Sequence, residues 1–221
     1  IGYFHGGDLK GLTEKLDYIQ GLGFNSIWIT PPVKQKYVQG DSAAYHGYWG
    51  LDFTTIDPHL GTEEDFKNFV TEAHSRGIKV IVDIVVNHTG DIIRYKGDVY
   101  SYSDIASYPY KDCNGKKIDI TKYIGKANFP KLCAAKSFPV PPIVSEKNKN
   151  VKAPAFLNDI TNYHNRGDST FEGESSTFGD FFGLDDVFTE KPEVVAGWTK
   201  VWQDWITKFD IDGYRIDTAK H

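Results

Sequence analysis

The 221-residue sequence lacks several features that would each point to a particular class of protein. No apolar run approaches the roughly 18 to 20 residues that a membrane-spanning helix requires. There is no long acidic or basic block, and the net charge is only −5, so nothing predicts binding to nucleic acid or to a membrane surface. These absences leave a globular chain whose partner is a small or neutral molecule, and they say nothing about its oligomeric state.

Cysteine is also scarce, since only Cys113 and Cys133 are present. Both lie in a stretch rich in Lys, Gly and Asn, a flexible setting in which an exported protein could form a disulfide. Two free thiols are the alternative. No signal peptide is visible in the sequence, which leaves its targeting open. We expect a disulfide and a secreted or extracytoplasmic protein.

The first part of the chain alternates between helix and strand patterns. Apolar residues recur at helical spacing over residues 9–19 and again over residues 66–73, which predicts two amphipathic helices. The apolar segments 24–30 and 78–86 follow these helices and are typical of strands buried on both faces. A strand after each helix is the order found in βα units with a parallel sheet.

A long irregular segment, residues 89–188, then interrupts this order with scattered Gly, Pro, Asn, Ser and Tyr. A third helix with a wide apolar stripe is predicted at residues 192–209, followed by a strand at residues 211–217. The pattern predicts an α/β fold in which one loop has grown into an inserted domain. Only three core strands are predicted, whereas a closed (β/α)8 barrel needs eight strands and about 250 residues. Unless the sheet is open, we therefore expect the chain to be an excerpt of such a barrel.

Two oppositely charged residues, Arg215 and Asp217, lie two positions apart on the last predicted strand, so their side chains point to the same side. A guanidinium beside a carboxylate favours the charged form of that carboxylate, and a carboxylate nucleophile requires this form. A structural ion pair is the alternative on spacing alone. The position at the end of a strand, next to Lys220 and His221, favours the catalytic interpretation.

Polar and aromatic residues also follow the earlier strands. Asp83, Asn87 and His88 occupy the strand at residues 78–86 and its end, and the Asn87 amide and His88 imidazole could simply hydrogen-bond to loop backbone. Asn87 together with a carboxylate such as Asp186 would instead supply the hard oxygens that suit Ca²⁺. Residues 45–49 place three aromatic rings and an imidazole in a loop, which fits stacking on a sugar as well as packing of a turn.

Two segments resemble signature regions of the α-amylase family of glycoside hydrolases. Residues 82–88, VDIVVNH, are similar to the first region, and residues 212–221, DGYRIDTAKH, are similar to the second. Residues 45–49 resemble the loop after the family's second strand, and residues 183–187 resemble a short signature near the end of its domain B. The resemblance implies a partial TIM (β/α)8 barrel, from about helix one to strand four.

The resemblance also implies domains and catalytic roles. Residues 1–88 and 189–221 would belong to the barrel, and residues 89–188 would form the inserted domain B. Asp217 would be the nucleophile in retaining hydrolysis of starch-like α-glucans, and Arg215 would orient it. The family's general acid and its transition-state stabiliser would lie outside this sequence, so the isolated chain is expected to be inactive.

Substrate and metal contacts follow from the same resemblance. The residues implied to line the sugar subsites are Tyr48, His46, His88, Trp49, Lys220 and His221. A structural calcium ion would be bound by Asn87, Asp186 and the backbone carbonyl of His221. A transglycosylase of the same family and a non-catalytic amylase-like binding domain are the alternatives, and the intact set of Asp217, Arg215, His88 and Tyr48 favours an enzyme.

Overall fold

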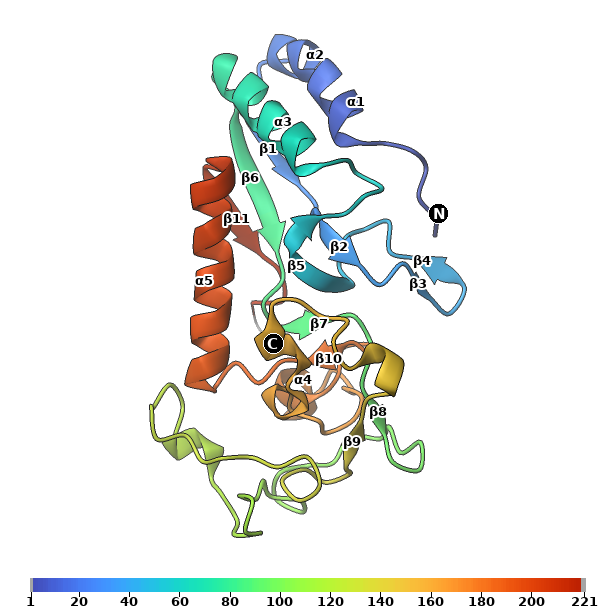
Figure 1. The fold of residues 1–221 in the computed structure, drawn as a ribbon, viewed down its shortest axis with the longest axis vertical. Helices are drawn as coiled ribbons and strands as arrows, with labels where there is room; N and C mark the ends of the chain where they lie inside the picture. The colour runs from blue at the N-terminus through green and yellow to red at the C-terminus, as the bar shows by residue number, and fades with distance from the viewer. Residues whose placement is uncertain (1, 220–221) are drawn as a thin grey trace. The chain divides into compact units, whose positions relative to one another are not determined.

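The computed structural model describes residues 2–219 (Figure 1). The chain forms two compact units. Unit 1 comprises Ile1–Val85 and Lys200–Asp217, and unit 2 comprises Val86–Thr199 and Thr218–His221. Within residues 2–219, no helix has both the length and the apolar character needed to cross a membrane.

Unit 1 contains a parallel sheet of three strands in the order β1, β6, β11. These strands are β1 (Ser26–Ile29), β6 (Lys79–Ile84) and β11 (Gly213–Ile216). The central strand, β6, consists mainly of β-branched residues, and its residues from Val80 to Ile84 are buried or half-buried, as in strands covered on both faces. The predicted parallel sheet is therefore confirmed, and its register places Arg215 beside Asp83. The sequence predicts that residues 24–30 are buried on both faces, but β1 lies at the edge of this sheet and its residues are exposed or half-buried, with Trp28 57% exposed.

The first helix of unit 1 begins where the sequence supplies a capping group. Asp8 caps α1 (Leu9–Glu14) by accepting a hydrogen bond from the Gly11 amide at 2.7 Å. A separate helix, α2 (Leu16–Gly21), follows, although the sequence predicts one continuous helix here. The Thr13 hydroxyl donates to the Leu9 carbonyl at 2.8 Å, and such back-bonding bends a helix.

A capping box opens α3 (Glu63–Ser75): Thr62 and Asp65 each bind the other's backbone amide. The buried face of α3 includes Phe66, whose ring meets those of Trp205 and Phe209 with centroids 5.7 and 4.8 Å apart. These two residues belong to α5 (Pro192–Phe209), which begins with a proline, a favoured first helical residue. The core of unit 1 is thus largely aromatic.

Short antiparallel strands complete unit 1. They are β2 (Val33–Gln35), which pairs with β5 (Gly50–Ile56), and β3 (Val38–Gln39), which pairs with β4 (Ser42–Ala43). The aromatic loop 45–49 lies between β4 and β5. Both of its ends are therefore anchored by strand pairing.

Unit 2 consists of short elements and long loops. Its strands are β7 (His88–Thr89) paired with β10 (Asp185–Asp186), and β8 (Arg94–Tyr95) paired with β9 (Pro142–Ile143). One short α-helix, α4 (Ser175–Phe178), and the 3₁₀ turns Ile120–Lys122, Glu146–Asn148, Ala155–Asn158 and Ile160–Asn162 lie between them. A separate apolar core contains Tyr110, Ile118, Ile120, Leu132, Phe138 and Phe188.

Unit 2 contains a buried ion pair. Lys152 and Asp185, only 3% and 1% exposed, meet at 2.6 Å. The Lys152 ammonium also donates to the Tyr163 hydroxyl at 3.0 Å, and Asp185 accepts from the backbone amides of Ile92 and Ile93. Each buried charge therefore has several partners, as burial of a charge requires.

Cys113 and Cys133 are joined in a disulfide, with Cα atoms 5.1 Å apart. Because they are separated by 20 positions, the bond restricts the unfolded chain, and its removal is expected to lower the free energy of unfolding by about 3 kcal/mol. Urea denaturation of the wild type and of the double variant Cys113→Ser/Cys133→Ser, each with and without reductant, measures this. The reductant should shift the midpoint of the wild type only; an unshifted wild type would contradict the prediction.

Candidate active site

A fully buried carboxylate, Asp83, is at the centre of a polar cluster in unit 1. The Tyr48 hydroxyl donates to Asp83 Oδ2 at 2.8 Å. Arg215 Nη1 lies 3.1 Å from both carboxylate oxygens, because the register of β6 and β11 places the two residues side by side. Burial and the hydrogen bond to Asp83 raise the pKa of Tyr48 well above its usual value, so its phenol stays protonated and donates. Asp83 therefore ties the 45–49 loop to β11.

The same guanidinium contacts the predicted nucleophile. Arg215 Nη1 donates to Asp217 Oδ1, and the Asp217 amide donates to the Ile84 carbonyl at 2.9 Å, which continues the ladder beyond β11. The Trp28 ring lies 5.3 Å from the guanidinium carbon, within range of a cation–π contact. The Asp217 side chain is 19% exposed, so it is held on several sides and still reached by solvent.

The aromatic loop depends on Gly47. This glycine has φ +86°, and a Cβ there would lie 2.4 Å from the Pro31 carbonyl oxygen, so only glycine fits. The tight turn lets His46 Nδ1 accept a hydrogen bond from the Tyr48 amide at 3.0 Å. The His46 ring stacks on Tyr48 and meets Trp49 edge-on, with centroids 5.7 and 4.7 Å apart. Burial lowers the pKa of His46, which favours the neutral acceptor form.

Unit 2 holds a second polar cluster. Asn87 Nδ2 donates to Asp186 Oδ1 at 3.1 Å, and Asn87 Oδ1 lies 3.0 Å from His88 Nδ1. The buried His164 bridges Asp186 and Glu190 through its two ring nitrogens. Burial alone would lower the pKa of His164, but these two carboxylates outweigh it and raise the pKa to about 10. Burial raises the pKa of Asp186 to about 6, and His164 opposes that rise.

The cluster around Asn87 and Asp186 supplies some, but not all, of the oxygen ligands that a hard cation needs. Asn87 and Asp186 are buried, lie in contact with each other, and offer the amide and carboxylate oxygens that Ca²⁺ prefers. Within residues 2–219, no group of three or more His, Cys, Asp or Glu is placed to hold a metal ion. Two side-chain ligands are thus available, and further ligands would have to be carbonyl oxygens or water.

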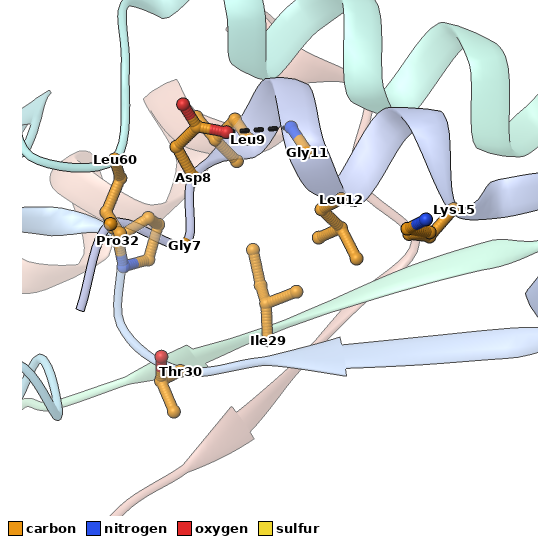
Figure 2. A pocket seen from close by; sticks show the side chains of 11 residues that line it. Gly7, Asp8, Leu9, Gly11, Leu12, Lys15, Ile29, Thr30, Pro32 and Leu60 are labelled. Atoms are coloured by element: carbon orange, nitrogen blue, oxygen red, sulfur yellow. Dashed lines mark hydrogen bonds between the residues drawn. The ribbon is translucent and has the colours of Figure 1, made fainter.

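A pocket of about 460 Å³ in unit 1 is distinct from both clusters. Its lining includes Leu12 from α1 and Ile29 from β1, which point into it in Figure 2. The Asp8 carboxylate at its rim is engaged in capping α1. None of the predicted site residues lines this pocket, so it does not belong to the candidate site.

The structure thus divides the predicted site residues into three groups. Unit 1 brings together Tyr48, His46, Trp49, Arg215 and Asp217. Unit 2 brings together His88, Asn87 and Asp186. Lys220 and His221 lie outside the described residues.

Sequence reasoning did not assign a role to Asp83 or His164. The available signal for Asp83 was a single carboxylate within a β-branched strand, because a charge buried there must have a partner. His164 lies in an irregular segment where no periodicity marks buried positions. Its partners, Asp186 and Glu190, are 22 and 26 residues away.

Comparison with known proteins identifies the family. The protein-family model of the alpha-amylase catalytic domain matches residues 4–221. An "Alpha-amylase" of Streptomyces lividans is 52% identical over 100% of this chain and 24% of its own length. The "Periplasmic alpha-amylase" of Escherichia coli is 31% identical over 100% of this chain and 36% of its own length. The chain therefore belongs to the alpha-amylase family of glycoside hydrolases, whose catalytic domain is a TIM barrel.

Solved structures give the same result. The alpha-amylase from Geobacillus thermoleovorans, complexed with acarbose, has a TM-score of 0.63 at 32% identity and is matched over 36% of its chain. An alpha-amylase from Malbranchea cinnamomea has a TM-score of 0.66 at 29% identity and is matched over 37% of its chain. Both matches cover 100% of the present chain. The chain thus spans between about a quarter and just over a third of these relatives.

Proposed function

We propose that the chain is part of the catalytic barrel of a retaining α-amylase that hydrolyses α-glucosidic bonds in starch-like α-glucans. The observation that carries the proposal is the contact of Arg215 with both Asp83 and Asp217. Arg215, which is held by the buried Asp83, fixes the orientation of the Asp217 carboxylate. Relatives named alpha-amylases and the acarbose in the Geobacillus thermoleovorans complex support a glucan substrate.

In this proposal Asp217 attacks the anomeric carbon and forms a glycosyl ester while the leaving oxygen takes a proton from a general acid. Water then hydrolyses the ester, and the stereochemistry of the anomeric carbon is retained. The general acid must lie about 5 to 5.5 Å from the nucleophile. We place it in the remainder of the barrel, since the relatives are much longer than this chain.

The sugar contacts belong to the same proposal. Tyr48 would stack on the ring held before the cleaved bond, supported by its hydrogen bond to Asp83 and by stacking with His46. The other contacts proposed are His46, Trp49, His88, Lys220 and His221. The turn at Gly47 supports this role, because it presents several rings from one short loop.

The domain boundaries and the location of the protein are also proposals. Residues 1–88 and 189–221 are assigned to the barrel, from about helix one to strand four, and residues 89–188 to domain B. The separate core of unit 2 supports an inserted domain. An extracytoplasmic location is supported by the disulfide and by the periplasmic relative.

Product stereochemistry tests the proposed reaction. When the complete enzyme acts on a maltooligosaccharide, proton NMR should first detect the α-anomer of the new reducing end, with β appearing only through mutarotation. Initial β-anomer would show inversion and refute the mechanism. Products longer than the substrate would identify the transglycosylase, and sugar binding without turnover would identify the non-catalytic domain.

Calcium is the proposed metal, held by Asn87, Asp186 and the backbone carbonyl of His221. A metal bound only by the folded state stabilises it by about 2.7 kcal/mol at a concentration 100 times its Kd. A chelator is therefore expected to lower the Tm of the complete enzyme, and added Ca²⁺ to restore it. Asn87→Ala should lower the Tm and remove the chelator response, whereas Asn68→Ala, an exposed control on α3, should keep it. A wild-type Tm unaffected by chelator would exclude the site.

A further inference from the structure

Gln35, the last residue of β2, is a buried polar residue whose side chain binds the aromatic loop 45–49. It is 3% exposed, and its Oε1 accepts a hydrogen bond from the Trp49 amide at 2.6 Å. Its Nε2 donates to the Val33 carbonyl at 2.7 Å. Both ends of this side-chain amide are therefore partnered, as burial of a polar group requires, and one partner is the backbone of a proposed sugar contact.

The irregular pairing of β2 with β5 explains why a side chain takes this place. The three residues of β2 pair with partners that are spread over the seven residues of β5. Such an irregularity interrupts the ladder of backbone hydrogen bonds and bends the strand. Beside it, the Trp49 amide donates to the Gln35 side chain, and the Trp49 carbonyl accepts from the Lys36 amide at 2.8 Å. Residues 35 and 36 thus hold both polar backbone groups of Trp49.

Asp57 fixes Gln35 from the other side. The Gln35 amide donates to Asp57 Oδ2 at 3.0 Å, and Asp57 is 1% exposed. Asp57 Oδ1 accepts from the His59 amide at 2.9 Å, and the Asp57 amide donates to the Pro32 carbonyl at 2.8 Å. Because groups outside the aromatic loop hold Asp57, Gln35 connects that loop to a fixed point within unit 1.

The position of the Trp49 backbone affects the other rings of the loop. The Trp49 ring meets His46 edge-on with centroids 4.7 Å apart, and His46 stacks on Tyr48. The Tyr48 hydroxyl is held by Asp83, whereas the end of the loop next to β5 is held by Gln35. Stacking on a sugar is tighter when the rings are already in place, because a loop that must be ordered on binding loses affinity.

We infer that Gln35 is a positioning residue of the sugar site. It holds the Trp49 backbone so that the loop presents Tyr48 and Trp49 to the glucan before the glucan binds. Gln35 itself is buried and contacts the sugar only through the loop. Arg215 holds Asp217 separately, so loss of Gln35 should weaken sugar binding and leave the chemical step nearly intact. The inference rests on the proposed function, because it takes the loop to be a sugar contact.

Gln35→Met in the complete enzyme tests this, since methionine has a similar length but cannot accept a hydrogen bond from the Trp49 amide as the glutamine does. Initial rates on maltoheptaose should show a KM raised about tenfold, the effect of losing one buried hydrogen bond, with kcat nearly unchanged. Calorimetric titration with Asp217→Asn present should show the Kd raised by the same factor, which would locate the effect in binding.

Control variants separate positioning from stability. Val70→Ala truncates a residue of α3 that is 2% exposed, and it should lower the Tm without changing KM. Gln203→Met makes the same substitution at an exposed position of α5 and should change neither quantity. Should Gln35→Met not fold, Asp57→Asn takes its place, because it nearly keeps the size of the side chain and weakens only the anchor of Gln35; it should raise KM by a smaller factor.

The outcomes separate the inference from the proposed function. A Gln35→Met enzyme with wild-type KM and Kd, whatever its Tm, would refute the inference and leave the proposed function standing. A KM increase that Val70→Ala reproduces would do the same, since loss of stability alone would account for it, as would a wild-type KM for Asp57→Asn where Gln35→Met does not fold. If the Asp217→Asn enzyme binds no maltooligosaccharide at all, the proposed function fails, and the inference fails with it.

Discussion

Asp217→Asn is expected to reduce the kcat of the complete enzyme on the order of 10⁴-fold while sugar binding largely survives. The amide nearly matches the carboxylate in size but cannot attack the anomeric carbon, and loss of a nucleophile has effects of this magnitude. Initial rates and the Kd for a maltooligosaccharide separate the two effects. Asp210→Asn is the matched control, since the Asp210 side chain is 96% exposed, and it should retain full activity.

A trapping experiment identifies the nucleophile directly. A fluorinated glycosyl fluoride that accumulates the covalent intermediate should label the peptide containing Asp217, because retaining catalysis passes through that ester. A label on another carboxylate would refute the assignment. So would an Asp217→Asn enzyme with more than about a tenth of wild-type kcat, since a tenfold loss corresponds to only about 1.4 kcal/mol of transition-state stabilisation.

Asp83→Ala is expected to have the second largest effect, on stability and turnover together. Removing the carboxylate leaves the Tyr48 hydroxyl and the Arg215 guanidinium without their shared acceptor. Removing one partner of a fully buried ion pair lowers the free energy of unfolding by about 3 to 5 kcal/mol. Because the Arg215 side chain is 41% exposed and keeps its contact with Asp217, we expect a loss of about 2 kcal/mol for Asp83→Ala. A nucleophile displaced by about 1 Å loses on the order of 100-fold in kcat.

Two variants isolate this effect. Tyr48→Phe removes only the hydroxyl bond to Asp83 and should cost less stability than Asp83→Ala. Asp52→Asn changes a carboxylate of unit 1 that accepts hydrogen bonds from the amide and hydroxyl of Thr54 in its own strand, and it should leave kcat unchanged. Urea denaturation and initial rates measure both quantities. An Asp83→Ala enzyme with wild-type kcat would show that Asp83 does not position Arg215.

Local signals were sufficient for the regular elements of unit 1. The run of β-branched residues at 78–86 predicts β6 because such residues suit a strand covered on both faces. Thr62 and Asp65 predict the start of α3 because a capping box satisfies backbone amides within one turn. The break at Lys15 between α1 and α2 was not predicted, since apolar spacing continues through it.

The sequence by itself therefore determined the order of helices and strands, the family motifs and the pairing of Arg215 with Asp217, all of which depend on residues close together in the chain. The tertiary structure decided the contacts of Asp83 with Tyr48 and Arg215, 35 and 132 residues away. It also decided the burial of Lys152 against Asp185 in a segment without periodicity. Such pairs form only when folding removes water from both partners, and nothing local in the sequence records which distant charge will be buried beside a given residue.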